Sequence, residues 1–274
     1  MEACEGSQHW ARKLQELGYE VKLMSGKMVR AFVSGNKNDA ADARAIYMAA
    51  QQLEVKAVAI KTEGQQAVLA MHRIRQQLVK MRTAQINALR GLLAEYGEVF
   101  GTGRKSFDVG IKAALERVAE RLPMPLIDTL RDQWNDLARL DDRIESSLLT
   151  WRREDRAAKA IFAIPGVGLS TATAVVAAMG DAKAFRSGRE FAAWLGLIPD
   201  QTGNGRKVRL LGMSKRGDTY LCTLLIHGAR AVLRCPRLLS PLLQQLSQRR
   251  PMNVVIAALA NKIARTILAV LAHD

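Results

Sequence analysis

Residues 62–99 read TEGQQAVLAMHRIRQQLVKMRTAQINALRGLLAEYGEV, and this stretch decides the fold class. Side chains that suit a helix–helix contact recur along it at three-four spacing. They are Met71, Ile74, Leu78, Met81, Gln85, Ala88 and Leu92. Such a heptad seam is typical of one long helix that packs along a second helix. Gly101 and Gly103 follow it and predict where the helix breaks.

A second seam lies further along the chain, interrupted by Asp141. Its members are Ile127, Leu130, Trp134, Leu137, Ile144, Leu148 and Trp151. Two long helices joined by a loop predict an antiparallel coiled-coil hairpin or a dimerising arm. The pattern equally suits two helices packed in the core of one monomeric domain, and the sequence leaves both interpretations open.

The first sixty residues have α/β character. Residues 5–17 predict a helix, and residues 19–24 alternate like a strand. A second helix is expected to begin at Asn38 or Asp39, either of which suits an N-cap. Residues 55–60 predict a second strand. This segment is too short to close a stable α/β domain alone.

The composition changes again from Ala160 onward. Glycine and basic residues are frequent there, and the predicted helical segments are short. A domain boundary is expected near residue 155, inside a charged stretch. We therefore predict a mixed, mainly α chain. Its three parts are a partial RNase H-like segment (1–61), a coiled-coil helical region (62–154) and a helical C-terminal domain (155–274).

The charge of the chain is strongly positive and unevenly spread. The formal net charge is +15 over 274 residues. Residues 201–274 hold 12 Lys and Arg against only Asp218 and Asp274, so this segment carries +10 of the total. A field of one sign favours a polyanionic partner, and nucleic acid is favoured over a merely solvated surface because the basic residues cluster around loop signals.

The sequence favours a cytoplasmic location without a membrane span. Residues 1–5 have neither the basic nor the apolar region of a secretory signal. The apolar run 254–271 is broken by Asn261, Lys262 and Arg265, which predicts a buried amphipathic helix. The chain has three cysteines and no Cys-x-x-Cys spacing, which argues against a disulfide framework and a zinc site.

Residues 164–168 read Ile-Pro-Gly-Val-Gly and precede an apolar helix. Gly166 and Gly168 allow a tight turn with exposed backbone N–H groups, and the next helix would point its positive N-terminus at the same place. This favours a helix-hairpin-helix that contacts a DNA phosphate. A simple helix–helix turn is the alternative.

Residues 203–218 begin as a flexible glycine loop and become densely basic. Ser214 is followed at once by Lys215 and Arg216, and adjacent cations favour an alkoxide and stabilise charge on a phosphoryl group. A serine nucleophile that attacks a DNA phosphodiester would need this setting. On spacing alone, however, a serine before a helix is more often an N-cap.

Asp39 and Asp42 are three residues apart on the helix expected from residue 38, so both carboxylates lie on one face. Two hard oxygen ligands can hold Mg²⁺ or Mn²⁺, which suits phosphoryl transfer. The alternative is a capping Asp beside a solvent-facing Asp.

Taken in order, these stretches resemble one family: bacterial insertion-sequence transposases that join a RuvC-like domain to a C-terminal domain with a catalytic serine. Residues 1–4 resemble the segment that carries the family's glutamate, and residues 37–43 resemble the segment with its last two aspartates. Residues 165–168, 194–199 and 214–218 follow in the expected order. The resemblance covers nearly the whole chain.

The resemblance implies a recombinase that cuts and rejoins DNA through a covalent bond to Ser214. The family's acidic set is Asp-Glu-Asp-Asp, which implies Mg²⁺ at Glu2, Asp39 and Asp42. It also implies a structured bridge RNA as guide, beside DNA as partner. Lys215 and Arg216 would stabilise developing charge, and Lys207 and Arg209 would contact the DNA backbone.

One departure from the family shapes the expected activity. A strand with the first aspartate precedes the glutamate segment in the family, whereas Met1 opens the segment here. We therefore expect an N-terminally truncated RuvC-like domain, and a catalytically inactive nucleic-acid-binding remnant is the alternative function. Homo-oligomerisation through the 62–151 helices is expected in either case, and an oligomerisation module is a third interpretation.

Overall fold

The computed structural model describes residues 1–36, 38–52, 55–204, 207–214, 216–238 and 240–273. Nine further side chains within helices lie outside the description: Gln133, Leu137, Ala138, Leu140, Asp141, Ile144, Ser147, Pro236 and Leu242. Helices make up 68% of the chain, and the described residues add two small two-stranded sheets. The prediction of a mainly α chain is confirmed.

The chain folds as two compact units. The first comprises residues 1–67, 164–167 and 175–274, and the second comprises residues 68–163 and 168–174. The division into 1–61, 62–154 and 155–274 was drawn from sequence texture, and it stays a prediction.

The N-terminal part of the first unit is a small α/β arrangement. It contains α1 (Ser7–Glu16), β1 (Leu23–Met24), α2 (Gly26–Val29), the 3-10 helix η1 (Arg30–Phe32), α3 (Asp39–Gln51) and β2 (Ala57–Val58). β1 pairs with β2 in antiparallel fashion, and Glu2 bridges to Met24 in parallel. The chain before α1 therefore meets β1 through one isolated bridge. Both predicted strands are present but shorter than expected.

The start of α3 confirms one expected helix cap. The Asn38 side chain accepts a hydrogen bond from the Ala41 amide at 2.8 Å. One inner face of α3 carries Ala45 and Ala49, which pack with Met24 and Val29 in a small core. Small side chains on this face let the helix lie close to the strands.

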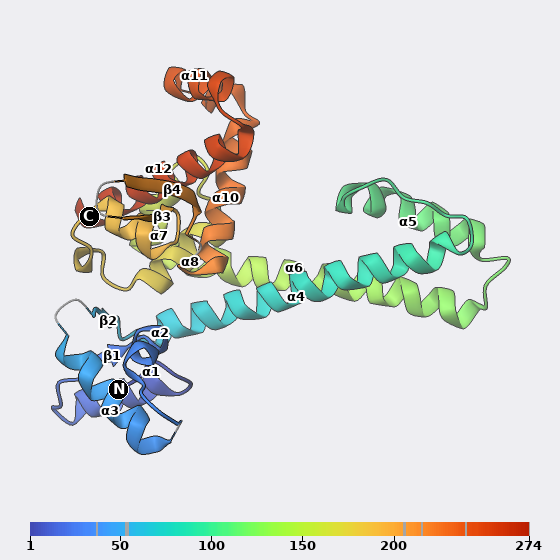
Figure 1. Cartoon of the computed structure of the whole chain (residues 1–274). Coiled ribbons are helices and arrows are strands. Elements are labelled where there is room, and N and C mark those ends of the chain that lie inside the picture. The colour runs from blue at the N-terminus through green and yellow to red at the C-terminus, as the bar shows by residue number, and fades with distance from the viewer. Residues whose placement is uncertain (37, 53–54, 205–206, 215, 239, 274) are drawn as a thin grey trace. The chain divides into compact units, whose positions relative to one another are not determined.

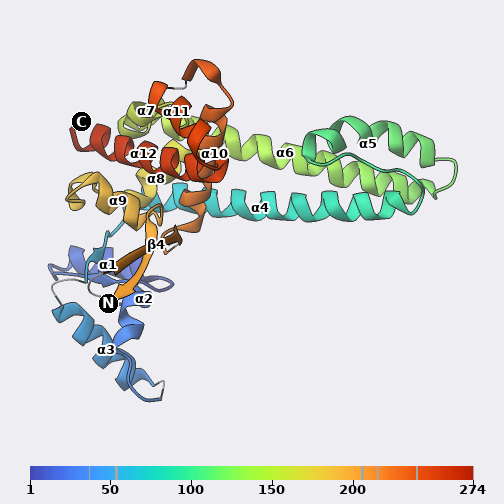
Figure 2. The ribbon, with the colours of Figure 1, turned by 45° about the horizontal axis from the view of Figure 1, so that its top comes forward.

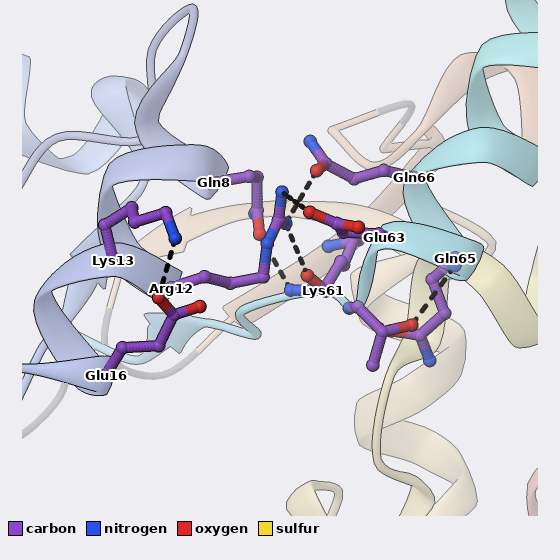
Figure 3. Close-up of polar contacts among 9 residues, drawn as sticks. Gln8, Arg12, Lys13, Glu16, Lys61, Glu63, Gln65 and Gln66 are labelled. Atoms are coloured by element: carbon purple, nitrogen blue, oxygen red, sulfur yellow. Dashed lines mark hydrogen bonds and ion pairs between the residues drawn. The ribbon is translucent and has the colours of Figure 1, made fainter.

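Two side chains of α1 hold the segment that leads into the long helix α4 (Glu63–Ala94). Gln8 accepts from the Lys61 amide at 2.7 Å and donates to the Ala59 carbonyl at 3.3 Å, as a neighbouring strand would. Arg12 donates to the Lys61 carbonyl at 2.8 Å and to Gln66 Oε1 at 2.6 Å (Figure 3). These bonds fix how the chain leaves the N-terminal segment.

The C-terminal part of the first unit surrounds the long apolar helix α12 (Met252–His273). The other elements are η2 (Ala182–Ala184), α9 (Gly188–Trp194), β3 (Pro199–Asn204), β4 (Lys207–Met213), α10 (Thr219–Leu233), η3 (Pro236–Leu238) and α11 (Pro241–Arg249). α12 packs against α9 and α10 (Figure 2). Its buried face includes Val255, Leu259 and Ile263. By length and composition alone α12 could cross a membrane, but 44% of its most apolar window is buried in the protein.

The second unit is built on long helices: α4 from Val68 onward, α5 (Arg104–Val118), α6 (Met124–Glu154) and α7 (Arg156–Phe162), with the first half of α8 (Leu169–Met179). α4 and α6 run antiparallel, and α5 folds back beside their far end (Figures 1 and 2). Ile86, Leu93, Phe107, Ile111 and Ile127 are among the residues that form the core there. The sequence interpretation did not include α5.

The predicted seam on α4 is wrong by one residue. Ile74 and Met81 are 51% and 46% exposed, whereas the residues buried on α4 are Val68, His72, Ile86, Leu89 and Leu93. Between His72 and Ile86, the inward positions hold half-buried Arg75, Val79 and Arg82. Met71, Leu78, Gln85 and Leu92 of the predicted seam are half-buried, so the seam lies at the edge of the buried face and not at its centre.

The second seam is confirmed where α6 side chains are described. Ile127, Leu130 and Leu148 are buried, while Trp134 and Trp151 are half-buried. The side chains of Leu137, Asp141 and Ile144 lie outside the described residues.

A buried polar pair joins α4 to α8 inside the second unit. His72 is 2% exposed, and its Nε2 lies 2.9 Å from Thr173 Oγ1. The Thr173 hydroxyl donates its proton to the Leu169 carbonyl at 2.9 Å, so His72 Nε2 is the donor toward Thr173. Burial, and secondarily the charge of Arg75, lowers the pKa of His72 to about 4, so the ring is neutral at pH 7.

Candidate functional site

The basic stretch after Pro199 forms a β-ribbon and not the flexible glycine loop expected from sequence. β3 and β4 are antiparallel and pair Gln201 with Leu210 and Asn204 with Lys207. An added Cβ at Gly203 would overlap the Lys207 carbonyl, so glycine permits the close approach of the strands. Gly205 and Arg206, which connect the strands, lie outside the described residues.

A glycine-terminated helix end leads into the ribbon. α9 ends at Trp194, and Gly196 follows with φ +73°, a conformation that favours glycine. The Gly196 amide donates to the Ala193 carbonyl and the Leu197 amide to the Ala192 carbonyl, both at 2.9 Å. This is a Schellman motif, which explains why the Trp-Leu-Gly-Leu-Ile-Pro stretch turns sharply before β3.

Ser214 lies directly after β4 and is tied to this helix end. Its amide donates to the Ile198 carbonyl at 2.9 Å, and its Oγ donates to the Gly196 carbonyl at a long 3.5 Å. The side chain is half-buried. The weak second bond leaves the hydroxyl free to exchange partners.

The sequence left open that Ser214 is the N-cap of the next helix. The structure shows that it is not. Asp218 precedes α10, and its Oδ1 accepts from the Tyr220 and Leu221 amides at 2.8 Å and 3.0 Å. The N-cap of α10 is therefore Asp218. Helix capping gives no reason for a serine at position 214.

Ser214 lines an open pocket of about 310 Å³ with Ala193, Ile198, Pro199, Asp200, Gln201 and Arg216. Arg216 is exposed, and its guanidinium lies 3.5 Å from Asp200 Oδ1. An exposed ion pair at this distance is weak, so an incoming phosphate can compete for the guanidinium. Lys215, the other predicted cation, lies outside the described residues.

Gly217 fixes the segment between Ser214 and α10. An added Cβ there would overlap the backbone of Trp194, Leu195 and Gly196. The chain after Ser214 thus lies directly on the end of α9, an approach that only glycine allows. Gly217 lies within the 214–218 stretch that carries the family resemblance, but the sequence alone assigned it no role.

The three predicted metal ligands occupy the N-terminal part of the first unit. Glu2 is half-buried, and an added Cβ at Gly26 would overlap its carboxylate, so Gly26 makes room for Glu2 at the start of α2. Asp39 and Asp42 lie in the first turn of α3, where the helix dipole stabilises acids. Among the described residues, no three His, Cys, Asp or Glu side chains come together as a metal-ligand cluster.

The two glycines of the predicted helix-hairpin-helix have different surroundings. Gly166 has φ +88°, and an added Cβ would lie 2.9 Å from Ile263 and 3.1 Å from the Gly228 carbonyl. Packing on α10 and α12 therefore explains Gly166. Gly168 is exposed, and an added Cβ meets no described atom within 4 Å. Phosphate contact at these residues stays a prediction.

Of the predicted residues, Ser214 and Arg216 line the same pocket, and the exposed Lys207 and Arg209 lie on β4, the strand that leads to Ser214. Sequence reasoning missed Asp200 in the pocket and the capping role of Asp218. An Asp directly before the apolar run of α10 was a usable sequence signal for the cap.

Two family models match the chain. The model described as "Transposase IS116/IS110/IS902 family" matches residues 158–244, and the transposase model DEDD_Tnp_IS110 matches residues 1–98. The first match contains the ribbon, Ser214 and Arg216, and the second contains the three predicted acids.

Relatives in bacteria agree with these models over the length of the chain. The probable family 20 transposase of Pseudomonas aeruginosa is 45% identical over 100% of this chain and 83% of its own length. The transposase for insertion sequence element IS1111A of Coxiella burnetii is 41% identical over 100% of this chain and 77% of its own length. For the transposase of element IS1328 of Yersinia enterocolitica the values are 37%, 97% and 80%. The chain therefore belongs to the IS110/IS116 family of insertion-sequence transposases.

Proposed function

We propose that the chain cuts and rejoins DNA strands through a covalent bond between Ser214 and a DNA phosphate. The observation that carries the proposal is the setting of the Ser214 hydroxyl. Ser214 lines an open pocket that Arg216 also lines, its hydroxyl is held only by a long bond to the Gly196 carbonyl, and the helix-capping role that would otherwise explain a serine belongs to Asp218.

In the first step Ser214 Oγ attacks the phosphorus atom and loses its proton. An ester bond forms between Oγ and phosphorus, and the bond from phosphorus to one deoxyribose oxygen breaks. That oxygen takes up a proton and leaves as a hydroxyl. In the second step a deoxyribose hydroxyl of another strand attacks the same phosphorus and releases Ser214, so the number of ester bonds is conserved.

We propose that Arg216 stabilises the negative charge that develops on the phosphate in this reaction. Its guanidinium borders the same pocket and is held only by a weak, exposed pair with Asp200. A phosphate that enters the pocket would replace Asp200 and form charge-assisted hydrogen bonds to Arg216. Lys215 would add a second positive charge by its place in the sequence.

We also assign Glu2, Asp39 and Asp42 to a divalent-metal site, but only as part of its ligand set. DEDD transposase domains typically use a divalent metal. The described residues bring no three suitable side chains together. Glu2, Asp39 and Asp42 therefore do not come together as one three-ligand Mg²⁺ site in this structure, and no step above is routed through the metal.

The covalent intermediate can be trapped and seen on a denaturing gel. The full chain would be incubated with labelled plasmid DNA that carries the insertion sequence encoding it. We expect labelled DNA on the wild-type protein and on Thr219→Ala, whose exposed hydroxyl lies in the first turn of α10. Ser214→Ala should carry none. A labelled Ser214→Ala protein would show that Ser214 is not the nucleophile.

Nucleic-acid binding without cutting is the second candidate function. It is favoured because no three of the described His, Cys, Asp and Glu side chains come together to hold a metal ion. The expected signature is metal-independent binding whose affinity falls steeply with salt, with no cleaved product. A cleaved strand in the plasmid assay would exclude this candidate.

We propose two further partners, a structured guide RNA and a second copy of this chain. The guide RNA binds the basic C-terminal segment of residues 201–274, and the helices of residues 62–151 form the contact between copies. Sedimentation of the full chain with and without substitutions on the exposed Ile74–Met81 face of α4 tests the second point. A monomer at all concentrations would contradict it.

A further inference from the structure

The β3–β4 ribbon has two chemically different faces. Residues directly opposite each other in antiparallel strands project to the same side. The pairs Thr202–Arg209 and Asn204–Lys207 therefore share one face, which we call the donor face. All four residues are exposed. Each has a side-chain hydrogen-bond donor, and two of them are cationic.

The opposite face is apolar at its centre. It carries the pairs Gly203–Val208 and Gln201–Leu210. Val208 is 67% exposed and Leu210 is 62% exposed. The end of the ribbon near Met213 packs beside α10 and α12, where Leu211 and Met213 line a pocket with Ile226. Among the described residues of the ribbon, 201–204 and 207–210 are exposed on both faces.

The two cations of the donor face, Lys207 and Arg209, form no ion pair with another described residue. Among ion pairs between described residues, none involves Lys207 or Arg209, whereas Asp200 of the same ribbon pairs with Arg216. An exposed two-stranded ribbon has little stability by itself, because few of its side chains are buried. A partner that binds the donor face would therefore also stabilise the ribbon.

We propose that the donor face enters the major groove of duplex DNA and reads base edges there. The major groove is about 12 Å wide and admits a two-stranded ribbon, whose strands lie about 4.8 Å apart. The minor groove is about 6 Å wide and is too narrow for two paired strands with side chains. The inference rests on the proposed function only in taking DNA as the partner.

The chemistry of the four side chains fits direct readout. Arg209 can bond the O6 and N7 atoms of guanine, and Asn204 can bond the N6 and N7 atoms of adenine. Thr202 can bond either purine edge, and Lys207, nearest the tip, can reach a phosphate or guanine. The ribbon therefore adds a sequence preference of its own, separate from the chemistry at Ser214.

Methylation footprinting with dimethyl sulfate tests this placement, because the reagent marks guanine N7 in the major groove and adenine N3 in the minor groove. The full chain would be bound to a short labelled duplex of mixed sequence. We expect protected guanine N7 atoms and unprotected adenine N3 atoms. The donor-face double variant Lys207→Gln, Arg209→Gln should lose that protection and about tenfold or more in affinity. Its log affinity should also fall less steeply with log salt, by a slope of about 1, because Lys207 is the one of the two residues that can reach a phosphate.

The opposite face supplies the matched control. The double variant Val208→Thr, Leu210→Thr changes exposed residues of the same strand and should keep the protection and the affinity. Protection of adenine N3, loss of protection in this control, or full protection in the donor-face variant would each overturn the proposal. Ser214→Ala should protect guanine N7 like the wild type. One outcome would separate the two proposals: the wild type forms no covalent adduct, and guanine protection is still lost when Lys207 and Arg209 are replaced. That result would refute Ser214 as the nucleophile and would support the placement of the ribbon in the major groove.

Discussion

Replacing Gly217 with alanine is expected to damage both stability and DNA cutting. The added Cβ would overlap backbone atoms of Trp194, Leu195 and Gly196, which belong to the ordered end of α9. A flexible side chain could move aside, but this backbone is fixed by the Schellman hydrogen bonds of Gly196 and Leu197. The segment that carries Ser214 must therefore lift away from α9.

Overpacking of this kind costs about 1–3 kcal/mol, and atoms that cannot relax place the cost at the upper end. For a chain of this size the melting temperature would fall by roughly 2–12 °C. Because Ser214 is held by the Ile198 and Gly196 carbonyls, its hydroxyl would also leave the pocket. The covalent adduct should drop by more than the folded fraction alone explains.

Calorimetry and the covalent-adduct gel measure the two effects, with Gly212→Ala as the matched control. Gly212 lies in β4, and an added Cβ meets no atom within 4 Å in the described part of the chain. This control should melt at or slightly above the wild-type temperature. A Gly217→Ala protein that melts like the control and forms full adduct would refute the reasoning.

Three further predictions concern stability. Asp218→Ala should cost about 1 kcal/mol by chemical denaturation, because α10 loses its N-cap, and an unchanged midpoint would contradict the assignment. Gly228→Ala should destabilise the protein because its Cβ would overlap the Gly166 carbonyl, whereas Gly91→Ala on α4, with open space around its Cβ, should gain up to about 1 kcal/mol. The lowered pKa of His72, about 4 against 6.5 in the unfolded chain, means that the unfolded state binds the proton first as pH falls. The stability contributed by neutral His72 is therefore complete above pH 6.5 and is lost toward pH 4, by at most about 3 kcal/mol, and His72→Gln should flatten the pH dependence of melting over that window.

Local signals predicted part of the fold well. Asn38 before an alanine-rich helix predicted the start of α3, and the spacing of Ile127, Leu130 and Leu148 predicted the buried face of α6. On α4 the same reasoning selected Ile74 and Met81, although the neighbouring face is the buried one. Polar His72, Arg75 and Arg82 hold inward positions there, and their burial depends on partners that a hydrophobic pattern does not contain.

The candidate site was less predictable because it depends on backbone contacts between distant residues. The residue types around Ser214 indicated phosphoryl chemistry. The argument that Ser214 is not a helix cap depends on Asp218, which accepts the hydrogen bonds of the first free amides of α10. The ribbon was expected to be a loop, since Gly203 reads as a turn residue. Its role is to let β3 approach the Lys207 carbonyl, a contact that exists only after the strands pair.

The most direct test of the central claim is to map the protein–DNA bond by mass spectrometry. The chain would be purified under denaturing conditions from cells that carry its insertion sequence, then digested with nuclease and trypsin. We predict a residual nucleotide on the peptide that contains Ser214 and on no other peptide. A nucleotide attached to a different side chain, or cleaved and rejoined DNA without any attached peptide, would contradict the account.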